Sequence, residues 1–213
     1  PTHYGNFVLR LYRSLVDEGV IFLAESGPVI KRLPEFLGEP KAKRDLILFQ
    51  NDKELRPTGG LLTAYAVFRV EHGKIIAERS DDIYKLDATI GNKPRAPEPI
   101  LKYLPNEYIW HLRNTNLSPD FAVSMGDFWK IYQQSSERVN VDGIVAIDTQ
   151  FVTKIMDVIG VVKAYGIEFS TKKVPECDCP MIIYELEKYA DQPVAYERGS
   201  RKDMIGVLMG EMM

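Results

Sequence analysis

Residues that favour β-strands gather in four short segments of the chain. Residues 45–49 (Asp-Leu-Ile-Leu-Phe) form an apolar run that suits a buried strand, and residues 61–70 are rich in strand formers. The tight turn Glu71-His72-Gly73 predicts that residues 74–79 pair back as the second half of a β-hairpin. Residues 143–147 are the fourth predicted strand.

Helical patterns lie before and between these strands. Residues 6–25 place apolar side chains on one face at helical spacing. Ser118 and Pro119 are typical of an N-cap followed by a first helical residue, and they predict a helix to about Ser135. Thr149 is expected to cap a helix over residues 150–159 that Gly160 ends.

The remaining segments complete the expected order of elements. We expect one or two strands in residues 161–169 and helices over residues 181–189 and 201–213. Between the hairpin and Ser118 the pattern predicts a long loop with four prolines, Pro94, Pro97, Pro99 and Pro105.

A leading hairpin followed by alternating strands and helices predicts a mixed α/β fold of the α+β kind. Its core would be a central, mostly mixed β-sheet flanked by helices. Glycines and prolines punctuate residues 27–40, so we expect an N-terminal helical appendage over residues 1–40 and an α/β domain over residues 41–213. The appendage is interpreted as a helix packed on the core, with a partner-binding helix as the alternative.

Charge and composition narrow the function classes. The 213 residues are 45% hydrophobic and 27% charged, with a net charge of −3, so no general basic field recruits nucleic acid. An anionic ligand would need a local cluster of cations. Phosphate-loop, dinucleotide-binding and nucleophile-elbow motifs are absent from the sequence.

The sequence has no apolar stretch near the roughly 18 residues of a membrane span. Because the chain begins at Pro1 rather than Met, we expect it to be part of a longer protein. Any membrane anchor is then expected upstream of Pro1.

The two cysteines, Cys177 and Cys179, lie in the run Glu-Cys-Asp-Cys-Pro. They are too close to bridge easily within one extended strand, and acidic neighbours disfavour a thiolate. We interpret them as an unreacted loop pair. A strained or intermolecular disulfide and half of a metal site remain as alternatives.

Arginines and aspartates at predicted strand ends are the candidate site. Arg56 precedes Pro57-Thr58-Gly59-Gly60, whose backbone amides could approach an anion. The hairpin predicts that Arg79 returns to the same end of the sheet as Arg56, beside Asp81 and Asp82. These carboxylates, with Asp52, could hold a divalent cation or act as a base. Solvated arginines and loop salt bridges are the plainer interpretation.

Two further basic positions precede predicted helices. Arg113, in the run Arg-Asn-Thr-Asn, comes before the Ser118 helix, and Arg201 comes before the last helix. A helix N-terminus suits an anion, although simple capping and solvated basic turns explain the same residues.

Four runs of residues resemble the domain-of-unknown-function 4012 family. They span about residues 44–160 and are residues 48–60 (Leu-Phe-Gln-Asn-Asp-Lys-Glu-Leu-Arg-Pro-Thr-Gly-Gly), 80–84 (Ser-Asp-Asp-Ile-Tyr), 112–121 (Leu-Arg-Asn-Thr-Asn-Leu-Ser-Pro-Asp-Phe) and 142–148 (Asp-Gly-Ile-Val-Ala-Ile-Asp).

The order of these features is also similar, more remotely, to the LytR-CpsA-Psr cell-wall phosphotransferases. That resemblance implies a LytR-CpsA-Psr-like fold in which arginines and Mg²⁺ bind a polyprenyl pyrophosphate, and glycan phosphate passes to peptidoglycan. It implies that Arg56, Arg79, Arg113 and Arg201 bind the pyrophosphate. Arg79, Asp81 and Asp82 would be catalytic, and Asp52 and Asp81 would hold Mg²⁺.

The resemblance therefore implies an envelope domain on the extracytoplasmic face of a bacterial cell membrane. Its partner would be a polyprenyl-linked glycan or another phosphorylated lipid carrier, with no nucleic acid. The sequence departs from the phosphotransferases because Pro-Thr-Gly-Gly follows Arg56 and Glu78 precedes Arg79. A binding or assembly module without catalysis is thus the alternative to a transferase.

Overall fold

The computed structural model describes residues 26–28, 30–164 and 166–190. The chain divides into two compact units, one of residues before Arg44 together with Val70–Lys74, the other of Arg44–Arg69 and the residues from Ile75 onwards. The helices predicted over residues 6–25 and 201–213, and with them Arg201, lie outside the described residues.

The first unit joins a short helix to the tip of a hairpin. Residues 26–28 and 30–36 are helical. The carbonyl of Leu37 accepts a 2.8 Å hydrogen bond from the Gly73 amide. His72 Nδ1 lies 2.5 Å from Glu39 Oε1, and this hydrogen bond raises the pKa of the imidazole.

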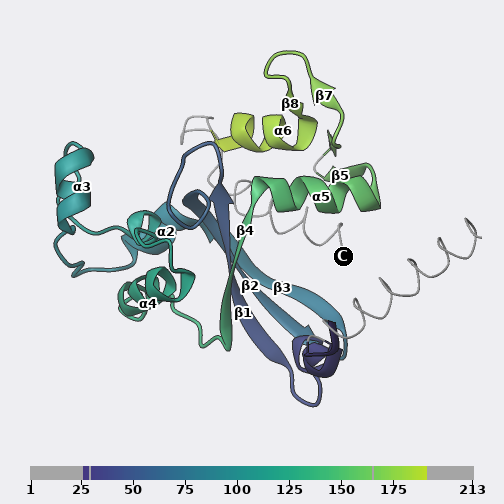
Figure 1. The fold of residues 1–213 in the computed structure, drawn as a ribbon, viewed down its shortest axis with the longest axis horizontal. Helices are drawn as coiled ribbons and strands as arrows, with labels where there is room; N and C mark the ends of the chain where they lie inside the picture. The colour runs from purple at the N-terminus through teal and green to yellow at the C-terminus, as the bar shows by residue number, and fades with distance from the viewer. Residues whose placement is uncertain (1–25, 29, 165, 191–213) are drawn as a thin grey trace, which may run out of the picture. The chain divides into compact units, whose positions relative to one another are not determined.

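The second unit is built on one four-stranded sheet in the order β3-β2-β1-β4 (Figure 1). Its strands are β1 (Lys43–Asn51), β2 (Leu61–Glu71), β3 (Lys74–Asp82) and β4 (Gly143–Asp148). β1 and β4 are parallel, from Asp45↔Gly143 to Gln50↔Asp148. All four predicted strands are present, and the predicted mixed sheet is confirmed.

The turn between β2 and β3 has the geometry that the sequence suggested. His72 and Gly73 have φ values of 49° and 73°. Two successive left-handed residues make a type I′ turn, whose twist matches that of paired strands. The hairpin is longer than predicted, because pairing continues to Asp82 rather than ending at Arg79.

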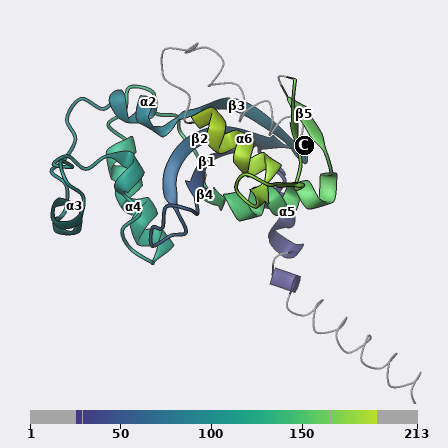
Figure 2. The same ribbon diagram turned by 90° about the horizontal axis from the view of Figure 1, so that it is seen from above.

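Helices cover one face of the sheet through a shared apolar core. α2 (Ile83–Ala88), the 3₁₀ turn η1 (Leu112–Asn114) and α4 (Phe121–Tyr132) lie together on this side (Figure 2). Their buried side chains pack with those of β1 and β2 in a cluster that includes Leu46, Leu48, Tyr65, Leu86, Leu112, Phe128 and Tyr132.

A second apolar cluster joins α5 (Thr149–Ile159) to the elements that follow it. These are β5 (Val162–Ala164), β6 (Ile167–Phe169), β7 (Lys173–Val174), β8 (Cys179–Pro180) and α6 (Met181–Ala190). Val152 and Met156 of α5 are buried with Phe169 and Ile182. Ile147 of β4 packs against this cluster and also against a small apolar cluster of the sheet, made of Ile47, Ala66 and Phe68. It therefore links these two clusters.

The predicted start of α4 is wrong by two residues, and that of α5 is wrong by one. α4 is capped by Asp120, whose side chain accepts from the amides of Ala122 and Val123, while Ser118 instead exchanges hydrogen bonds with Ser124. α5 is capped by Asp148, which accepts from the Phe151 amide. A carboxylate caps at least as well as a hydroxyl, and both helices have one within two residues of the predicted hydroxyl.

The predicted long loop is also wrong, because it contains α2, α3 (Glu98–Tyr103) and η1. Pro97 caps α3 and Pro99 lies in its first turn, a place where a missing amide proton does not matter. The prolines therefore mark a helix start that the apolar pattern was too short to reveal.

The interpretation of the cysteines as unreacted is wrong as well. Cys177 and Cys179 form a disulfide, with their Cα atoms 5.1 Å apart. The chain bends between them instead of staying extended, which removes the geometric objection.

Among the described helices, none has the length and apolar character needed to span a bilayer.

Candidate functional site

The carboxyl ends of β1 and β4 lie at the same edge of the sheet because the two strands are parallel. Asp52 follows β1 and contacts the first turn of α5. α5 directly follows β4 (Figure 1). Its carboxylate accepts hydrogen bonds from the Thr149 hydroxyl and, at 2.9 Å, from Gln150 Nε2. Burial raises the pKa of Asp52, but these two hydrogen bonds outweigh it, so the net pKa is lowered.

The 52–60 loop, between β1 and β2, is tightly hydrogen-bonded within itself. The Gly59 amide donates to Arg56 O at 2.9 Å, and the Leu61 amide donates to Glu54 O at 2.9 Å. The Gly59 amide is therefore not available to an anion, contrary to the expected amide nest. Gly60 is needed for space, since a Cβ there would lie 2.3 Å from the carbonyl oxygen of Asn51.

Two buried amide side chains hold this loop from beneath. Gln50 Nε2 donates to Thr58 Oγ1 at 2.6 Å, and Asn116 Nδ2 donates to Thr58 Oγ1 and Gly60 O, both at 2.8 Å. Gln50 is 5% exposed and Asn116 is fully buried. We call Gln50, Thr58, Gly60 and Asn116 the loop clamp.

The orientation of the Asn116 amide is fixed by chemistry. A carbonyl oxygen can only accept, so the nitrogen of Asn116 must face Gly60 O. Its Oδ1 is then buried and has no hydrogen-bond partner among the described residues. The clamp fixes the loop at the cost of one unsatisfied acceptor.

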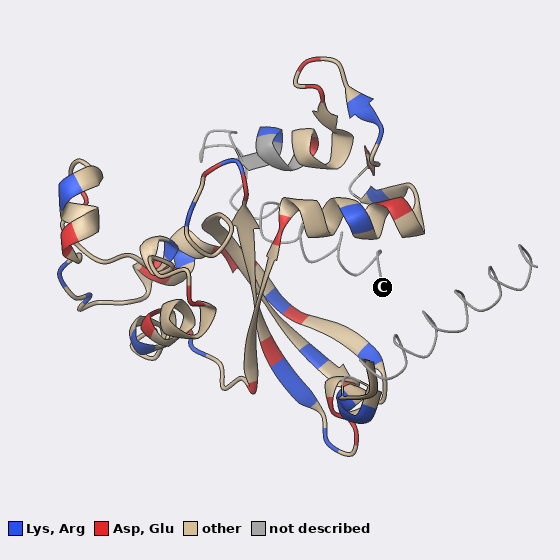
Figure 3. Cartoon of the chain, viewed as in Figure 1, with Lys and Arg blue, Asp and Glu red and all other residues tan. Residues whose placement is uncertain are grey.

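The loop tip carries a cation beside an apolar side chain. Arg56 is half-buried, and its guanidinium donates to Leu55 O at 2.9 Å. Within the described part of the chain it pairs with no carboxylate. Leu55 is 82% exposed. Figure 3 shows both signs of charge along this loop, which also contains Asp52, Lys53 and Glu54.

Arg79 has a different environment from Arg56. It forms a 2.8 Å ion pair with Glu137, and its guanidinium carbon lies 5.9 Å from the centre of the Tyr65 ring. Burial lowers the pKa of Arg79, but the hydrogen bond and the charge of Glu137 raise it by more, so the net pKa is raised. The structure therefore gives Arg79 a carboxylate partner of its own.

The neighbouring aspartates take part in local structure. Asp81 Oδ1 lies 3.1 Å from Lys85 Nζ, and the Asp81 side chain is only 9% exposed. Asp82 is the N-cap of α2 and accepts from the Tyr84 amide at 2.7 Å. Asp81 is thus already in an ion pair, and Asp82 already caps a helix.

Arg113 belongs to a buried polar network around Asp87. It pairs with Glu107 at 2.5 Å and lies over the Tyr84 ring at 4.8 Å. Asp87 accepts from His111 Nδ1 at 2.5 Å, and further from Lys93 Nζ at 2.9 Å and the Leu112 amide at 2.8 Å. Burial raises the pKa of Asp87, but these hydrogen-bond partners together lower it by more, so the net pKa is lowered.

The expected Mg²⁺ ligands, Asp52 and Asp81, already have partners in the protein. Both oxygens of Asp52 accept hydrogen bonds, and Asp81 is paired with Lys85. Across residues 26–28, 30–164 and 166–190, no three His, Cys, Asp or Glu side chains are grouped as metal ligands would be. The arrangement of Asp52 and Asp81 does not fit a Mg²⁺ site, and no step is assigned to the ion.

The structure thus places the predicted residues in three separate environments. Arg56 and Asp52 share the 52–60 loop, Arg79 and Asp81 lie towards the end of β3, and Arg113 joins the Asp87 network. Sequence reasoning missed the loop clamp and the Asp87 network. The amide residues in Gln50-Asn51 and Asn114-Thr115-Asn116 were the signal in the sequence for the loop clamp. An amide side chain that is buried needs hydrogen-bond partners, and a neighbouring loop can supply them.

With this geometry established, similarity to known proteins identifies the family. The model described as "Protein of unknown function (DUF4012)" matches residues 41–176. The chain belongs to this family. The DUF4012 match includes all four sheet strands and every residue of the loop clamp, and it ends immediately before Cys177. No curated protein and no solved structure matches the chain.

Proposed function

We propose that this DUF4012 domain binds a phosphate-bearing amphiphilic ligand of the cell envelope at the tip of its 52–60 loop. The ligand class is a polyprenyl-(pyro)phosphate-linked glycan, on the extracytoplasmic side of the membrane. The observation that carries the proposal is Arg56, the predicted ligand-binding arginine that pairs with no carboxylate in the described residues. Its fork of N–H donors matches phosphate oxygens.

The surroundings of Arg56 support an amphiphilic ligand rather than a free anion. Leu55 is 82% exposed directly beside the guanidinium, so one ligand could meet both a cation and an apolar side chain. The loop clamp holds the tip in one conformation, which lowers the entropy lost on binding. The resemblance to the LytR-CpsA-Psr phosphotransferases suggests the chemical class of the ligand.

Binding is favoured over transfer of glycan phosphate. A transferase would need Arg79, Asp81 and Asp82 at the phosphate, and each has a structural partner in this geometry. Transfer would require these side chains to leave their protein partners and contact the ligand instead. A module that binds the lipid carrier requires only the loop tip.

The test is a calorimetric titration of the domain with farnesyl pyrophosphate, a short polyprenyl pyrophosphate. We expect Arg56→Gln to weaken binding by about tenfold to a hundredfold, since a charge-assisted hydrogen bond contributes about 1.5–3 kcal/mol. Arg95→Gln is the matched control, because Arg95 is exposed and its substitution removes the same charge at a different place. Equal affinities of the Arg56 and Arg95 variants would contradict the proposal.

Two further titrations separate the parts of the ligand. Leu55→Ser should weaken binding of farnesyl pyrophosphate and leave binding of inorganic pyrophosphate unchanged, because Leu55 would contact only the apolar chain. Arg79→Gln should weaken binding only if the Glu137 pair opens towards the ligand. A tenfold loss there would favour the transferase, whereas no loss would leave Arg56 as the phosphate contact.

A further inference from the structure

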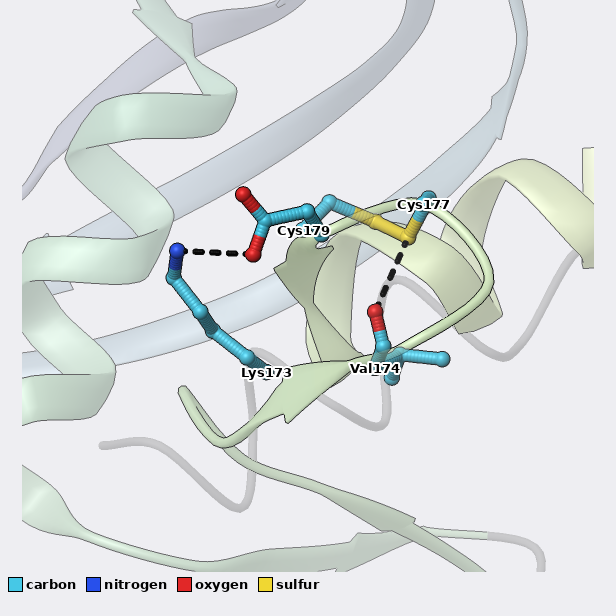
Figure 4. The surroundings of a disulfide bond; sticks show 5 residues. Lys173, Val174, Cys177 and Cys179 are labelled. Carbon is cyan, nitrogen blue, oxygen red and sulfur yellow. Dashed lines mark hydrogen bonds and ion pairs between the residues drawn. A yellow bond between two sulfur atoms is a disulfide. The ribbon is translucent and has the colours of Figure 1, made fainter.

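A disulfide closes the tip of the small hairpin made by β7 and β8 (Figure 4). The strands pair antiparallel, Lys173 with Pro180 and Val174 with Cys179. The bond joins Cys177 to Cys179, so only one residue lies between the two cysteines. The segment that matches the DUF4012 model, residues 41–176, includes β7 and ends before both cysteines.

The bond offers little to the stability of the fold. A disulfide stabilises chiefly by restricting the unfolded chain, and this gain increases with the length of the loop that it closes. A loop with one intervening residue gives the least. The hairpin is also closed independently, because the Cys177 amide donates to Val174 O at 3.4 Å.

The residue inside this ring has an uncommon backbone conformation. Asp178, between the two cysteines, has a φ of 49°. An L-residue pays for this left-handed region, although aspartate tolerates it better than most.

The hairpin is also accessible and electrostatically balanced for exchange. Cys177 is exposed and Cys179 is half-buried. Lys173 Nζ lies 2.8 Å from Asp178 Oδ1, so a cation offsets the carboxylate of the residue between the two cysteines. The carbonyl of Val174, 3.9 Å from Cys177 Sγ, is placed to accept a hydrogen bond from the reduced Cys177 thiol.

We propose that Cys177 and Cys179 form a redox-active disulfide that exchanges with accessible thiolates and oxidises dithiols. This activity is separate from ligand binding at Arg56. It needs no metal and no bound cofactor, and a small-molecule disulfide such as glutathione disulfide returns the pair to its oxidised form. Exposed disulfides of this kind are the exchangeable ones in proteins.

The exchange has two balanced steps. An external thiolate attacks Sγ of the exposed residue Cys177, the bond between the two cysteine sulfurs breaks, and its electron pair leaves on Cys179 as a thiolate that takes a proton from solvent. A second thiolate of the same substrate then attacks its own sulfur in the mixed disulfide and releases Cys177. The substrate dithiol becomes a disulfide, and the protein disulfide becomes two thiols.

The first experiment equilibrates the folded domain with glutathione buffers of graded ratio, followed by acid quenching, alkylation and mass measurement. Structural disulfides resist reduction by glutathione. We expect the ratio of reduced to oxidised domain to exceed that of a structural disulfide by at least about 100-fold, which corresponds to about 60 mV. A domain that stays oxidised at every glutathione ratio overturns the proposal.

An insertion of two glycines after Asp178 is the matched control for ring size. It keeps both sulfurs and their exposure but enlarges the ring, so the ratio of reduced to oxidised domain should fall by about tenfold. An unchanged ratio would show that the small ring does not make the bond exchangeable, and the argument from ring closure would fail.

Single variants test the order of attack. With glutathione disulfide, Cys179→Ser leaves the exposed Cys177 thiol and should form a glutathione adduct at least about tenfold faster than Cys177→Ser. Equal rates would contradict the assignment of Cys177 as the attacked sulfur.

A reduced peptide dithiol distinguishes protein substrates from glutathione alone. The wild-type domain should oxidise one equivalent of the peptide, and the variant with both cysteines changed to serine should oxidise none. Equal oxidation by both would overturn the proposal.

Discussion

Asn116 Nδ2 donates a 2.8 Å hydrogen bond to Thr58 Oγ1, 58 positions earlier in the chain. This contact joins two of the segments that resemble the DUF4012 family, the 52–60 loop and the run before α4. Since Asn116 is fully buried, its amide is a fixed part of the core beneath the loop. The loop tip owes its conformation to this side chain.

Asn116→Asp should therefore lower the free energy of unfolding by about 3 kcal/mol at neutral pH, because it buries a carboxylate facing the carbonyl of Gly60. Burial would raise the pKa of the new carboxyl in the folded state. The lost stability should thus return as the pH falls and the group takes up a proton. Asn140→Asp, at an exposed position, is the control in urea melts at two pH values.

Gly60 gives a second test of the loop. Gly60→Ala places a methyl group 2.3 Å from the Asn51 carbonyl oxygen, so the loop must move. We expect a loss of about 2–3 kcal/mol in the free energy of unfolding. Gly126→Ala, inside α4 with open space around it, should instead gain about 0.5–1 kcal/mol. Thermal melts of the two variants should shift in opposite directions.

Asp87 predicts an acid-dependent loss of stability. Its folded-state pKa is lowered, so the carboxylate stabilises the fold above its unfolded pKa of about 3.9, and this contribution is lost as the pH falls through the folded value. Asp87→Asn should cost about 3 kcal/mol at pH 7 and progressively less as the pH falls below about 4. Asp157→Asn, at an exposed ion pair, should show no such trend.

Apolar pattern predicted the sheet well, because burial of strand residues and turn chemistry are local properties of the sequence. The tight turn at His72-Gly73 and the four strands of the sheet followed from them. Helix starts were predicted less well, since Asp120 and Asp148 are carboxylates that cap as well as the nearby hydroxyls of Ser118 and Thr149. α3 was missed because six residues hold too few apolar positions to show a period.

The site was predicted only in part, because pairing between distant side chains is not a local property. The sequence places Arg56, Arg79 and Arg113 near element ends, but it does not show that Glu137 pairs with Arg79 or that Glu107 pairs with Arg113. Hydrogen bonds across 58 positions, such as that of Asn116, are equally invisible. The same limit applied to the cysteines, whose bridge depends on the left-handed turn at Asp178.

Two buried tyrosines offer the sharpest comparison of a satisfied and an unsatisfied hydroxyl. Tyr132 Oη accepts a 2.7 Å hydrogen bond from the Val139 amide, whereas Tyr65 Oη has no hydrogen-bond partner among the described residues. Both side chains are almost wholly buried. Tyr132→Phe should thus lower the free energy of unfolding by about 1–3 kcal/mol, because it leaves the Val139 amide without its acceptor.

Tyr65→Phe should leave the free energy of unfolding unchanged or raise it by about 1 kcal/mol, because it removes a hydroxyl that is desolvated without compensation. Burial raises the pKa of Tyr65 to about 12, with the charge of Arg79 opposing the shift. A raised folded-state pKa makes the wild type lose stability as the pH rises from about 10 towards 12, and the Phe variant should lose less over that range. Urea melts at pH 7 and at pH 10.5 measure both effects. A Tyr65→Phe domain that is less stable than Tyr132→Phe at pH 7 would show that the Tyr65 hydroxyl is hydrogen-bonded after all.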